Sequence, residues 1–483
     1  METTDVISPA RGTAAGLKRN ALGTPGIVFL VLSAAAPLTI MAGIAPLAIA
    51  VAGPAAPLGY LLAGVVLVLF STGFMAMTKH MRAAGGFYGY VTKSLGRTAG
   101  LATAALSVVS YNLIQIGLYG LFALQLQGLV LRFTGADVPW PLLAVAAILA
   151  VCLVGYRGVD VGAKVLGVLL VAETLILAVV AVAVLAQGGA DGIDVTSFSP
   201  AHLTDPGLVA VLGLAFGAFV GFESTVLYRS EARDPERTIP RATYIAVGFL
   251  ALFYAFVSWT TVLAFGSAQV QSLAAENLTD LFYIAADTYV GSWSGAAMAV
   301  LLATSLYAMQ LAFHNAINRY TYMLSRDGLT PAFLGRTHPR FRSPHIAGLA
   351  QTVVALVVVL AMAAVGADPY LHLMIWLNTP GVLGIICLQG LVSLATVVYL
   401  RRHREAATNR WVVPVAAVAT MLLFAAVYLV LANIGLMTAA DGVTNVLIAA
   451  VVPAVFAAGL ALARILRKTR PAIYEGIATN DGN

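Results

Sequence analysis

Two acidic side chains and one histidine lie inside apolar stretches of the sequence, where a charge is costly and a titrating group can serve a function. Glu173 follows Leu-Leu-Val-Ala, Glu223 ends the segment Phe-Val-Gly-Phe-Glu, and His314 lies within Leu-Ala-Phe-His-Asn-Ala. A charged side chain at the centre of a bilayer costs about 2.5–3.5 kcal/mol on insertion scales, so such residues are candidates for function by default. Two carboxylates and an imidazole in these places predict chemistry that involves protons or cations.

Glu173 and His314 are expected at similar depths. Glu173 lies nine residues beyond Lys164, roughly 13 Å into its apolar stretch, and His314 lies twelve residues from Arg326, roughly 18 Å into its own. Two simpler interpretations stay open. Glu173 can be a protonated acid bonded to a neighbouring carbonyl, and His314 can be satisfied by a polar neighbour on its own helix, with no role in proton movement.

Glu223 and three phenylalanines surround a glycine-rich segment. An acid in the first turn of a helix is stabilised by the helix dipole, which is one interpretation of Glu223; the other is a counter-ion for a cationic substrate. Phe216, Phe219 and Phe222 either pack as core aromatics or cover a bound ammonium group through cation–π contacts.

A polar stripe follows one face of another apolar stretch. Tyr111, Gln115 and Tyr119 are spaced at i, i+4 and i+8, so a helix places them on one side. Hydrogen bonds between helices explain such a stripe, and so does the lining of a polar pathway. Asn-Thr-Pro at 378–380 is a further interruption of an apolar run that is expected to line the same pathway.

The composition sets the class of protein that must position these residues. The chain has 483 residues, of which 60% are hydrophobic and 10% charged, and its mean hydropathy is +0.90. Soluble proteins carry about 45–50% apolar and about 25% charged residues. These values exclude a soluble enzyme, a disordered chain and a nucleic-acid binder. Cys152 and Cys387 both lie in apolar runs, which predicts buried thiols and no disulfide framework.

The apolar runs predict twelve transmembrane helices, because one crossing needs about 20 apolar residues. The runs lie near 25–52, 57–78, 98–131, 138–155, 160–187, 206–230, 240–266, 292–325, 346–366, 370–399, 411–435 and 442–466. Basic residues mark the cytoplasmic side of such a protein. With the N-terminus inside, every Lys and Arg except Arg132 falls on that side, which predicts that both termini are cytoplasmic.

Two of these helices are expected to be interrupted at matching places. Ser-Ala-Ala-Ala-Pro at 33–37 interrupts the first helix, and the glycine-rich segment 213–223 interrupts the sixth. The first and sixth helices begin two sets of five helices, 25–187 and 206–400. Because five is an odd number of crossings, the second set starts on the opposite side of the membrane and has the inverse orientation. Paired interruptions in two halves point to a binding site; a proline kink and close packing over glycine are the alternatives. The remaining parts are a cytoplasmic tail at 1–24, an outer loop at 188–205, two peripheral helices at 401–466 and a C-terminal tail at 467–483.

Three sequence blocks resemble the amino acid–polyamine–organocation transporters. Ala-Gly-Gly-Phe-Tyr-Gly-Tyr at 84–90 resembles a Gly-Gly-x-Tyr-x-Tyr segment of that family. The block from 219 to 242, which contains Gly-Phe-Glu and Asp-Pro-Glu-Arg-Thr-Ile-Pro-Arg-Ala, and the Arg-Asp-Gly block at 319–331 resemble two others. The resemblance covers about residues 20–400. It implies an all-α polytopic membrane protein with a five-plus-five inverted repeat, the leucine-transporter-like fold, discontinuous helices 1 and 6, and two peripheral helices.

The first helix departs from that family pattern. Relatives usually carry Gly-x-Gly at the interruption, where bare amides hold a substrate carboxylate, whereas this chain has Ser-Ala-Ala-Ala-Pro-Leu-Thr at 33–39. Its Pro-x-Thr is similar to the putrescine-importer branch. This difference questions a site for an α-amino-acid carboxylate and leaves an amine substrate open.

The resemblance also assigns roles to the candidate residues. The helices that carry Glu173 and His314 both approach helix 1 in that fold, which suggests a proton-coupling pair. The position of Glu173 resembles the one at which some proton-coupled relatives have a lysine on helix 5. The expected substrate-binding residues are Ser33, Ala34, Ala35, Ala36, Tyr111, Gln115, Phe216, Phe219, Phe222 and Glu223.

The function that these observations predict is import of an amino acid or small organic amine across the cytoplasmic membrane, by proton symport and alternating access. The expected source is a bacterium. An exchanger is the alternative, and a nutrient sensor is a weaker one because the tails are too short for a signalling domain. A channel or an intramembrane enzyme fits less well. We expect no cofactor or metal beyond the proton gradient, with sodium left open as the driving ion. The expected partners are a small-molecule substrate and the lipid bilayer, with no nucleic acid and no obligate protein partner.

Overall fold

The computed structural model describes residues 22–81, 86–157, 163–229, 232–341, 343–403 and 409–477, without the side chains of 163–166 and of Leu227. Within these ranges the regular secondary structure is helical, apart from one isolated bridge between Leu22 and Ala232. The expected N-terminal tail, up to residue 21, lies outside the described residues, as do residues 84 and 85 of the first family-like block.

Eleven helical segments of the described chain are long and apolar enough to cross a membrane. They are Thr24–Thr78, Arg97–Thr134, Trp140–Arg157, Gly167–Gln187, Pro206–Val226, Pro235–Phe265, Ser292–Arg326, His345–Ala364, Pro369–Arg402, Val412–Ala432 and Gly442–Thr469. The first is 55 residues long, far more than the others. The all-α, multi-pass class predicted from the sequence is confirmed.

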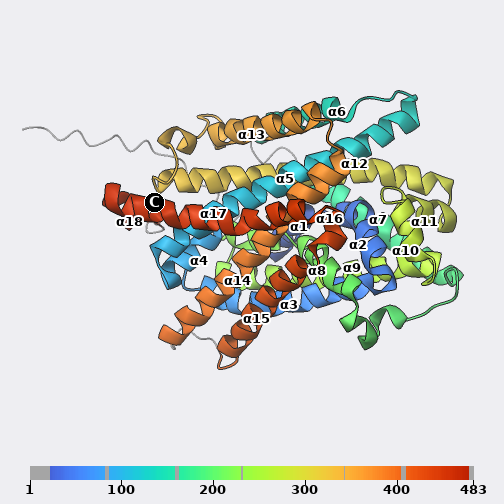
Figure 1. Ribbon diagram of the computed structural model, residues 1–483, viewed down its shortest axis with the longest axis horizontal. Helices are drawn as coiled ribbons and strands as arrows, with labels where there is room; N and C mark the ends of the chain where they lie inside the picture. Colours follow the sequence, from blue (N-terminus) through green and yellow to red (C-terminus); the bar gives the residue numbers. More distant parts are fainter. Residues whose placement is uncertain are drawn as a thin grey trace, which may run out of the picture.

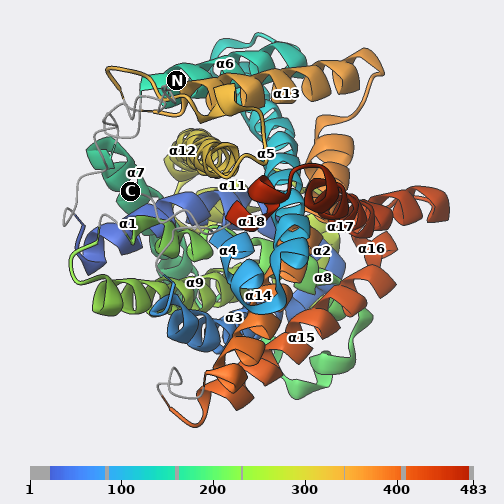
Figure 2. The ribbon, with the colours of Figure 1, turned by 90° about the vertical axis from the view of Figure 1, so that its left-hand side faces the viewer.

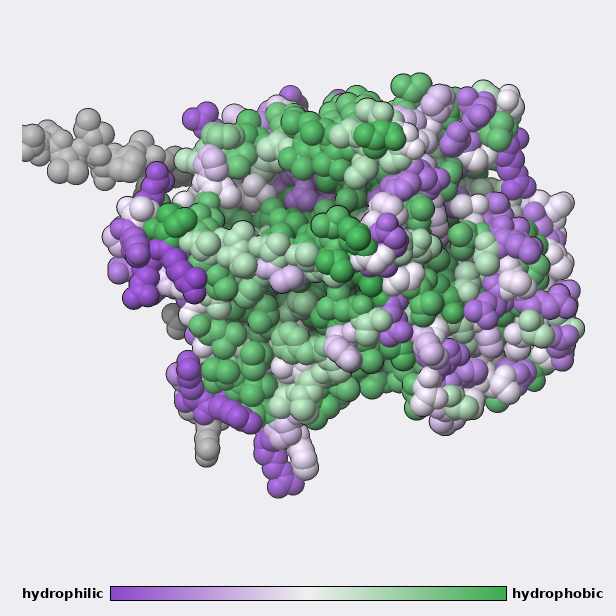
Figure 3. Space-filling model, in the orientation of Figure 1, coloured by the Kyte–Doolittle hydropathy of each residue, from purple (hydrophilic) through white to green (hydrophobic). Residues whose placement is uncertain are grey.

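The helices run roughly parallel to the long axis of the molecule (Figure 1). Figure 3 shows apolar residues in a broad band around its middle and hydrophilic residues collected toward its two ends. Many large apolar side chains of the long helices are exposed, for example Leu149 at 52%, Leu252 at 67% and Leu447 at 65%. Exposed apolar side chains on helices of this length are expected of a protein that is solvated by lipid.

The helices divide into those of the first half of the chain and those of the second. The first half contains α1 (Thr24–Ala35), α2 (Ala45–Ala52), α3 (Ala56–Thr78), α4 (Gly86–Leu95), α5 (Arg97–Thr134), α6 (Trp140–Arg157) and α7 (Ala163–Gln187). The second half contains α8 (Pro206–Gly217), α9 (Pro235–Phe265), α10 (Val270–Glu276), α11 (Leu281–Tyr289), α12 (Ser292–Arg326), α13 (His345–Ala364), α14 (Asn378–Arg402), α15 (Val412–Ala432), α16 (Ile434–Thr438), α17 (Gly442–Thr469) and α18 (Pro471–Gly476).

Both predicted interruptions are present. Helix α1 ends at Ala35, and Ala36 adopts a left-handed conformation with φ 45° before a π-helical turn, Thr39–Ile44, leads into α2. Helix α8 ends at Gly217, and η6, a 3-10 helix over Phe222–Tyr228, begins after Gly221. Proline at 37 has no backbone N–H to continue α1, and Gly221 has φ +112°, which residues with a side chain rarely adopt.

The third interruption, at 378–380, is also visible. A π-helical segment, Pro369–Leu377, precedes α14, which begins at Asn378. Helix α5 packs against both parts. A Cβ atom on Gly120 of α5 would lie 2.4 Å from the carbonyl oxygen of Pro369, so the missing side chain permits this approach.

Helix α12 is the element around which the site is assembled. It packs against α1, α5, α6, α7 and α13. Figure 2 looks along α12 and shows α6 and α13 together at its upper side. The interrupted helix α1 packs against α7, α9, α12 and η6, so that the first break lies among α7, α12 and the helix that follows the second break.

Helices α3 and α9 approach each other over Gly64, and we predict that its replacement by alanine destabilises the protein. A Cβ atom at this position would lie 2.3 Å from the Cβ atom of Ala251 and 3.5 Å from the ring of Phe219. Overpacking of this kind costs about 1–3 kcal/mol. The measurement is the melting temperature of the purified full-length protein in detergent, which should fall.

The matched control is Gly128→Ala on α5, where a Cβ atom would meet nothing within 4 Å. Its melting temperature should stay unchanged or rise slightly, because alanine favours a helix over glycine. Equal melting temperatures for the two variants would contradict the close packing of α3 on α9.

Candidate functional site

A cavity of about 130 Å³ lies between the two interrupted helices and α12. Its wall includes Ser33 and Ala34 at the end of α1, Gly221 and Glu223 at the start of η6, and Tyr111 of α5. The α12 side is formed by Ala308, Leu311, Ala312, Phe313, Asn315, Ala316, Arg319 and Tyr320. Except for Phe313, these α12 residues recur at helical spacings on one face, which is why one straight helix can form a whole side of the cavity.

Glu223 is held in this wall by two hydrogen bonds. The Tyr111 hydroxyl donates to Oε1 at 2.5 Å, and the backbone N–H of Gly221 donates to Oε2 at 3.0 Å. The residue is only 4% exposed. Because both partners are donors, the carboxylate form can accept both bonds, and each oxygen keeps a further lone pair for a bound cation.

The four residues of the first interruption divide between two environments. Ser33 and Ala34 line the cavity. Ala35 and Ala36 are fully buried behind it, where the hydroxyl of Tyr254 on α9 donates to the Ala35 carbonyl at 3.4 Å. The sequence therefore found the segment, and the structure brings only its first half to the cavity.

The three predicted phenylalanines pack away from the cavity. Phe216 is 3% exposed, and Phe219 and Phe222 are fully buried. Phe219 contacts the ring of Tyr254 edge-on with centroids 5.8 Å apart, and Phe222 contacts the ring of Phe70 in the same way at 6.0 Å. Core packing is thus the role that the structure shows for them.

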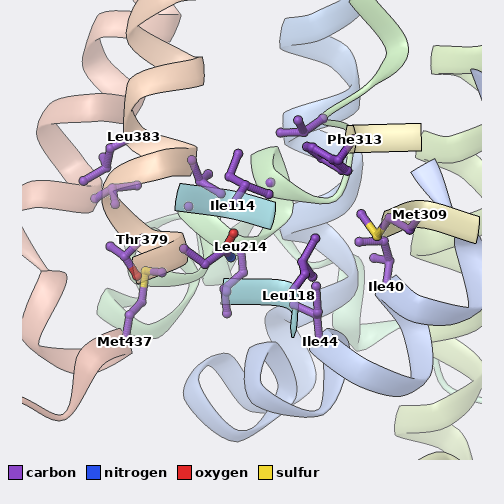
Figure 4. A pocket seen from close by; sticks show the side chains of 16 residues that line it. Ile40, Ile44, Ile114, Leu118, Leu214, Met309, Phe313, Thr379, Leu383 and Met437 are labelled. Carbon is purple, nitrogen blue, oxygen red and sulfur yellow. The ribbon is translucent and has the colours of Figure 1, made fainter. Parts of the chain in front are cut away.

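Phe313, which the sequence did not single out, lies between the cavity and a second, smaller one. It lines the first cavity and also an apolar space of about 30 Å³. Figure 4 shows this second space, with Ile114 and Leu118 of α5, Met309 and Phe313 of α12, and Thr379 of α14 around it. The rings of Phe313 and Tyr111 are 6.1 Å apart, so an aromatic pair separates the two spaces.

Glu173 lies behind the first interruption, not in the cavity. It is 4% exposed, and its hydrogen-bond partner is Ser305 of α12. Thr39, the first residue of the π-helical turn, donates to the Ser305 hydroxyl at 3.1 Å. The Oε2 atom of Glu173 has no partner among the described residues, so this carboxyl group has an unused acceptor beside the break in α1.

His314 belongs to a network of buried amides. Its Nδ1 atom contacts Oε1 of Gln351 on α13, and Nε2 of Gln351 donates to Oε1 of Gln115 on α5. Gln115 and Gln310 each donate to the other's backbone carbonyl, at 3.1 and 3.2 Å. The network ties α12 to α5 and α13, and it places Gln115 here instead of on the cavity wall.

The structure does not bring Glu173 and His314 together. The partner of Glu173 is Ser305, which precedes His314 by nine residues on α12. Nine residues correspond to roughly 13.5 Å along a helix and to half a turn around it, at 3.6 residues per turn. The two groups therefore face different neighbours, and the depth estimate alone missed their direction around α12.

Several partners were missed by sequence reasoning. Ser305, Gln351 and Tyr254 contact the predicted residues from helices far away in the sequence. A signal existed for Gln351, a polar residue in the apolar run 346–366. Asn315 and Arg319 in the cavity wall follow His314 by one and five residues on α12 and were not singled out as site residues.

A sequence model of the family described as amino acid permease matches residues 22–458. The chain belongs to the amino acid permease family. The match includes both interruptions, the cavity and Glu173, so the site is built from the part of the chain that the family shares. The family and the names of the relatives indicate a transporter rather than an enzyme, with a small-molecule substrate of the amino acid or amine type.

Individual relatives carry different functional names. The chain is 28% identical to an uncharacterized transporter of Mycobacterium tuberculosis over 72% of its own length and 74% of the relative. It is 23% identical to the low-affinity putrescine importer PlaP of Escherichia coli, over 60% and 63% of the two chains. It is 21% identical to the branched-chain amino acid permease BcaP of Bacillus subtilis, over 61% and 65%. The relatives are bacterial, as expected for this permease.

The amide network predicts a large effect for Gln351→Ala. The substitution removes the partners of His314 and Gln115 in a buried place, and each unsatisfied group costs about 1–3 kcal/mol. The melting temperature of the purified permease should fall by several degrees. The control is Gln127→Ala, whose amide donates to Asp137 at an exposed site. If both variants melt like the parent protein, the network does not hold α12 to α13.

Proposed function

We propose that this permease is a secondary active transporter that imports an amino acid or small organic amine by proton symport and alternating access. The observation that carries the proposal is Glu223, a carboxylate held by Tyr111 and Gly221 in the wall of a cavity between two interrupted helices. Interrupted helices free backbone groups in a dry environment, and a bound ligand is one way to satisfy them.

The proposal includes twelve crossings with both termini in the cytoplasm. The segment Thr24–Thr78 has 55 residues, which is more than twice the length of about 20 that one crossing needs. Gly53 follows α2 with φ +55° and starts a short 3-10 turn before α3. Counting this segment as two crossings gives two sets of five, each beginning with an interrupted helix, and two peripheral helices.

The amino group of the substrate is the part that Glu223 is proposed to bind. Putrescine and branched-chain amino acids, named for two relatives, differ in most respects but both carry an ammonium group. A carboxylate that accepts from an ammonium group makes a charge-assisted hydrogen bond, roughly twice as strong as a neutral one. The capping role of Glu223 toward Gly221 is compatible with this, because it uses only one lone pair.

Glu173 is proposed to carry the coupling proton. Its partner Ser305 accepts a hydrogen bond from Thr39, which follows the break in α1. One of the Glu173 oxygens has no partner among the described residues. A change at the break would alter the surroundings of this carboxyl group, and a protonated and an ionised form would favour different positions of α1. His314 stays a second candidate, which would act through α13 and not through Glu173.

Glu173→Gln is predicted to abolish the pH dependence of uptake. Glutamine keeps the shape and the hydrogen bond to Ser305 but does not titrate. In proteoliposomes with an acidic exterior, uptake by the parent protein should exceed uptake without a gradient, whereas the variant should show equal rates in both. Thr174→Val, next in sequence and bonded to its own helix, should retain the dependence. Full pH-driven uptake by the glutamine variant would refute the coupling role.

Glu223→Gln is predicted to weaken substrate binding about tenfold or more, because it removes the charge that faces the ammonium group. The measurement is the KM for uptake, or the Kd of the purified protein, across a panel of amino acids and amines. The control Glu276→Gln changes an exposed acid of α10. An unchanged affinity in the Glu223 variant would leave only the capping role, and saturable uptake of no member of the panel would overturn the substrate class.

A further inference from the structure

The wall of the cavity has one negative and one positive side chain, Glu223 near the start of η6 and Arg319 beside Tyr228, the last residue of η6. Among the described residues that line it, Glu223 is the only acid and Arg319 the only base. Glu223 lies beside Tyr111, whereas the guanidinium group of Arg319 lies 6.0 Å from the ring of Tyr228 at the far end of η6. Such a cavity is complementary to a molecule that carries a positive group toward Glu223 and a negative group toward Arg319.

The backbone spacing of the residues around the two charges argues against a ligand that carries both charges on one carbon. Glu223 and Tyr228 are five residues apart on a 3-10 helix, a rise of about 10 Å. The second estimate comes from α12, where Arg319 follows Phe313 by six residues, about 9 Å, and Phe313 contacts the Tyr111 ring that binds Glu223. The ammonium and carboxylate groups of an α-amino acid share one carbon and cannot contact both ends.

The wall between the two charges is largely apolar. Val226 of η6 and Leu311, Ala312 and Ala316 of α12 are among the apolar residues that line the same cavity. Such a wall stabilises a chain of methylene groups, at about 0.8 kcal/mol for each one buried. Asn315 lies one helical turn before Arg319 on the same side of α12, so its amide is available beside the guanidinium group.

The basic end also discriminates against a diamine. An ammonium group at Arg319 would face a like charge, whereas a carboxylate group would form a charge-assisted pair that matches the planar guanidinium. Helix α1 brings only Leu30, Ser33 and Ala34 to the cavity wall, none of them charged, so Arg319 is the charged group of the described wall that fits a carboxylate.

We propose that the cavity binds an ω-amino acid, with the ammonium group at Glu223, the carboxylate at Arg319 and Asn315, and the methylene chain between them. This inference rests on the proposed transport function, and it narrows the substrate to an elongated zwitterion. Arg319 and Asn315 then determine specificity, and Glu223 supplies the binding that is common to all amines.

Three compounds of equal chain length test the inference on the purified full-length protein in detergent. They are 5-aminopentanoate, its isomer 2-aminopentanoate with both charges on one carbon, and the diamine 1,5-diaminopentane. We expect 5-aminopentanoate to bind about tenfold or more tightly than either of the others. Equal or tighter binding of the isomer or the diamine overturns the proposal, as does the absence of binding by all three.

Variants of one helix separate the basic end from general effects. Arg319→Gln should weaken 5-aminopentanoate about tenfold or more and leave 1,5-diaminopentane unchanged or improved, while Arg319→Lys should retain part of the selectivity. Arg326→Gln is the control, because this exposed arginine lies outside the cavity and stacks on Tyr322. An equal loss for all three compounds in both Arg319 variants would assign Arg319 a structural role and refute the proposal.

Uptake into proteoliposomes distinguishes this inference from the transport function beneath it. Selective binding of 5-aminopentanoate without uptake would refute transport and retain the two-ended site. Saturable uptake of 2-aminopentanoate or 1,5-diaminopentane in preference to 5-aminopentanoate would retain transport and refute the two-ended site.

Discussion

The structure depends on how two broken helices satisfy their backbone groups inside an apolar core. A helix that stops in the membrane leaves N–H and C=O groups whose burial without a partner costs several kcal/mol each. Side chains supply partners at both breaks. Glu223 accepts from the N–H of Gly221 at the second break, and Tyr254 donates to the carbonyl of Ala35 at the first. The same groups that stabilise the breaks therefore define what surrounds them, and the cavity forms on one side of these contacts.

This constraint explains which features were predictable from the sequence. Pro37 has no N–H with which to continue a helix, and the glycines of 213–221 permit a helix to stop. Both effects are independent of tertiary packing, so both breaks could be predicted from the sequence. Glu173 and Glu223 stand out because acids are rare in apolar runs, and both are buried as expected. The lengths of the apolar runs predicted twelve segments, and the described residues form eleven. The difference arises because Thr24–Thr78, which contains two of the predicted runs, is one continuous helical segment.

The partners of these residues were not predictable, because they depend on how helices pack across long stretches of chain. Thr39 and Ser305 are 266 residues apart, and Gln115 and Gln351 are 236 apart. The depth of a residue in the membrane follows from counting residues along its helix. The direction in which the side chain points around the helix does not, and this direction separates His314 from Glu173. Aromatic residues gave an equally incomplete signal. The phenylalanines nearest the second break fill the core, and Phe313 of α12 separates the two cavities.

The proposed coupling of proton and substrate has a short path through α1. Ala34 lines the cavity with Glu223, and the Cβ position of Gly221 lies 3.5 Å from the Ala34 side chain. The next residue, Ala35, bonds to Tyr254, and Thr39 bonds to Ser305, the partner of Glu173. Each acid thus reaches the same break through one intermediate residue, Gly221 for Glu223 and Ser305 for Glu173. In the proposed mechanism, a ligand that moves η6 against Ala34 would also move the surroundings of Glu173, and a proton on Glu173 would change the position of α1 that the ligand meets. Because coupling between two sites is reciprocal, one hinge in α1 is sufficient for both directions, and no direct contact between the acids is required.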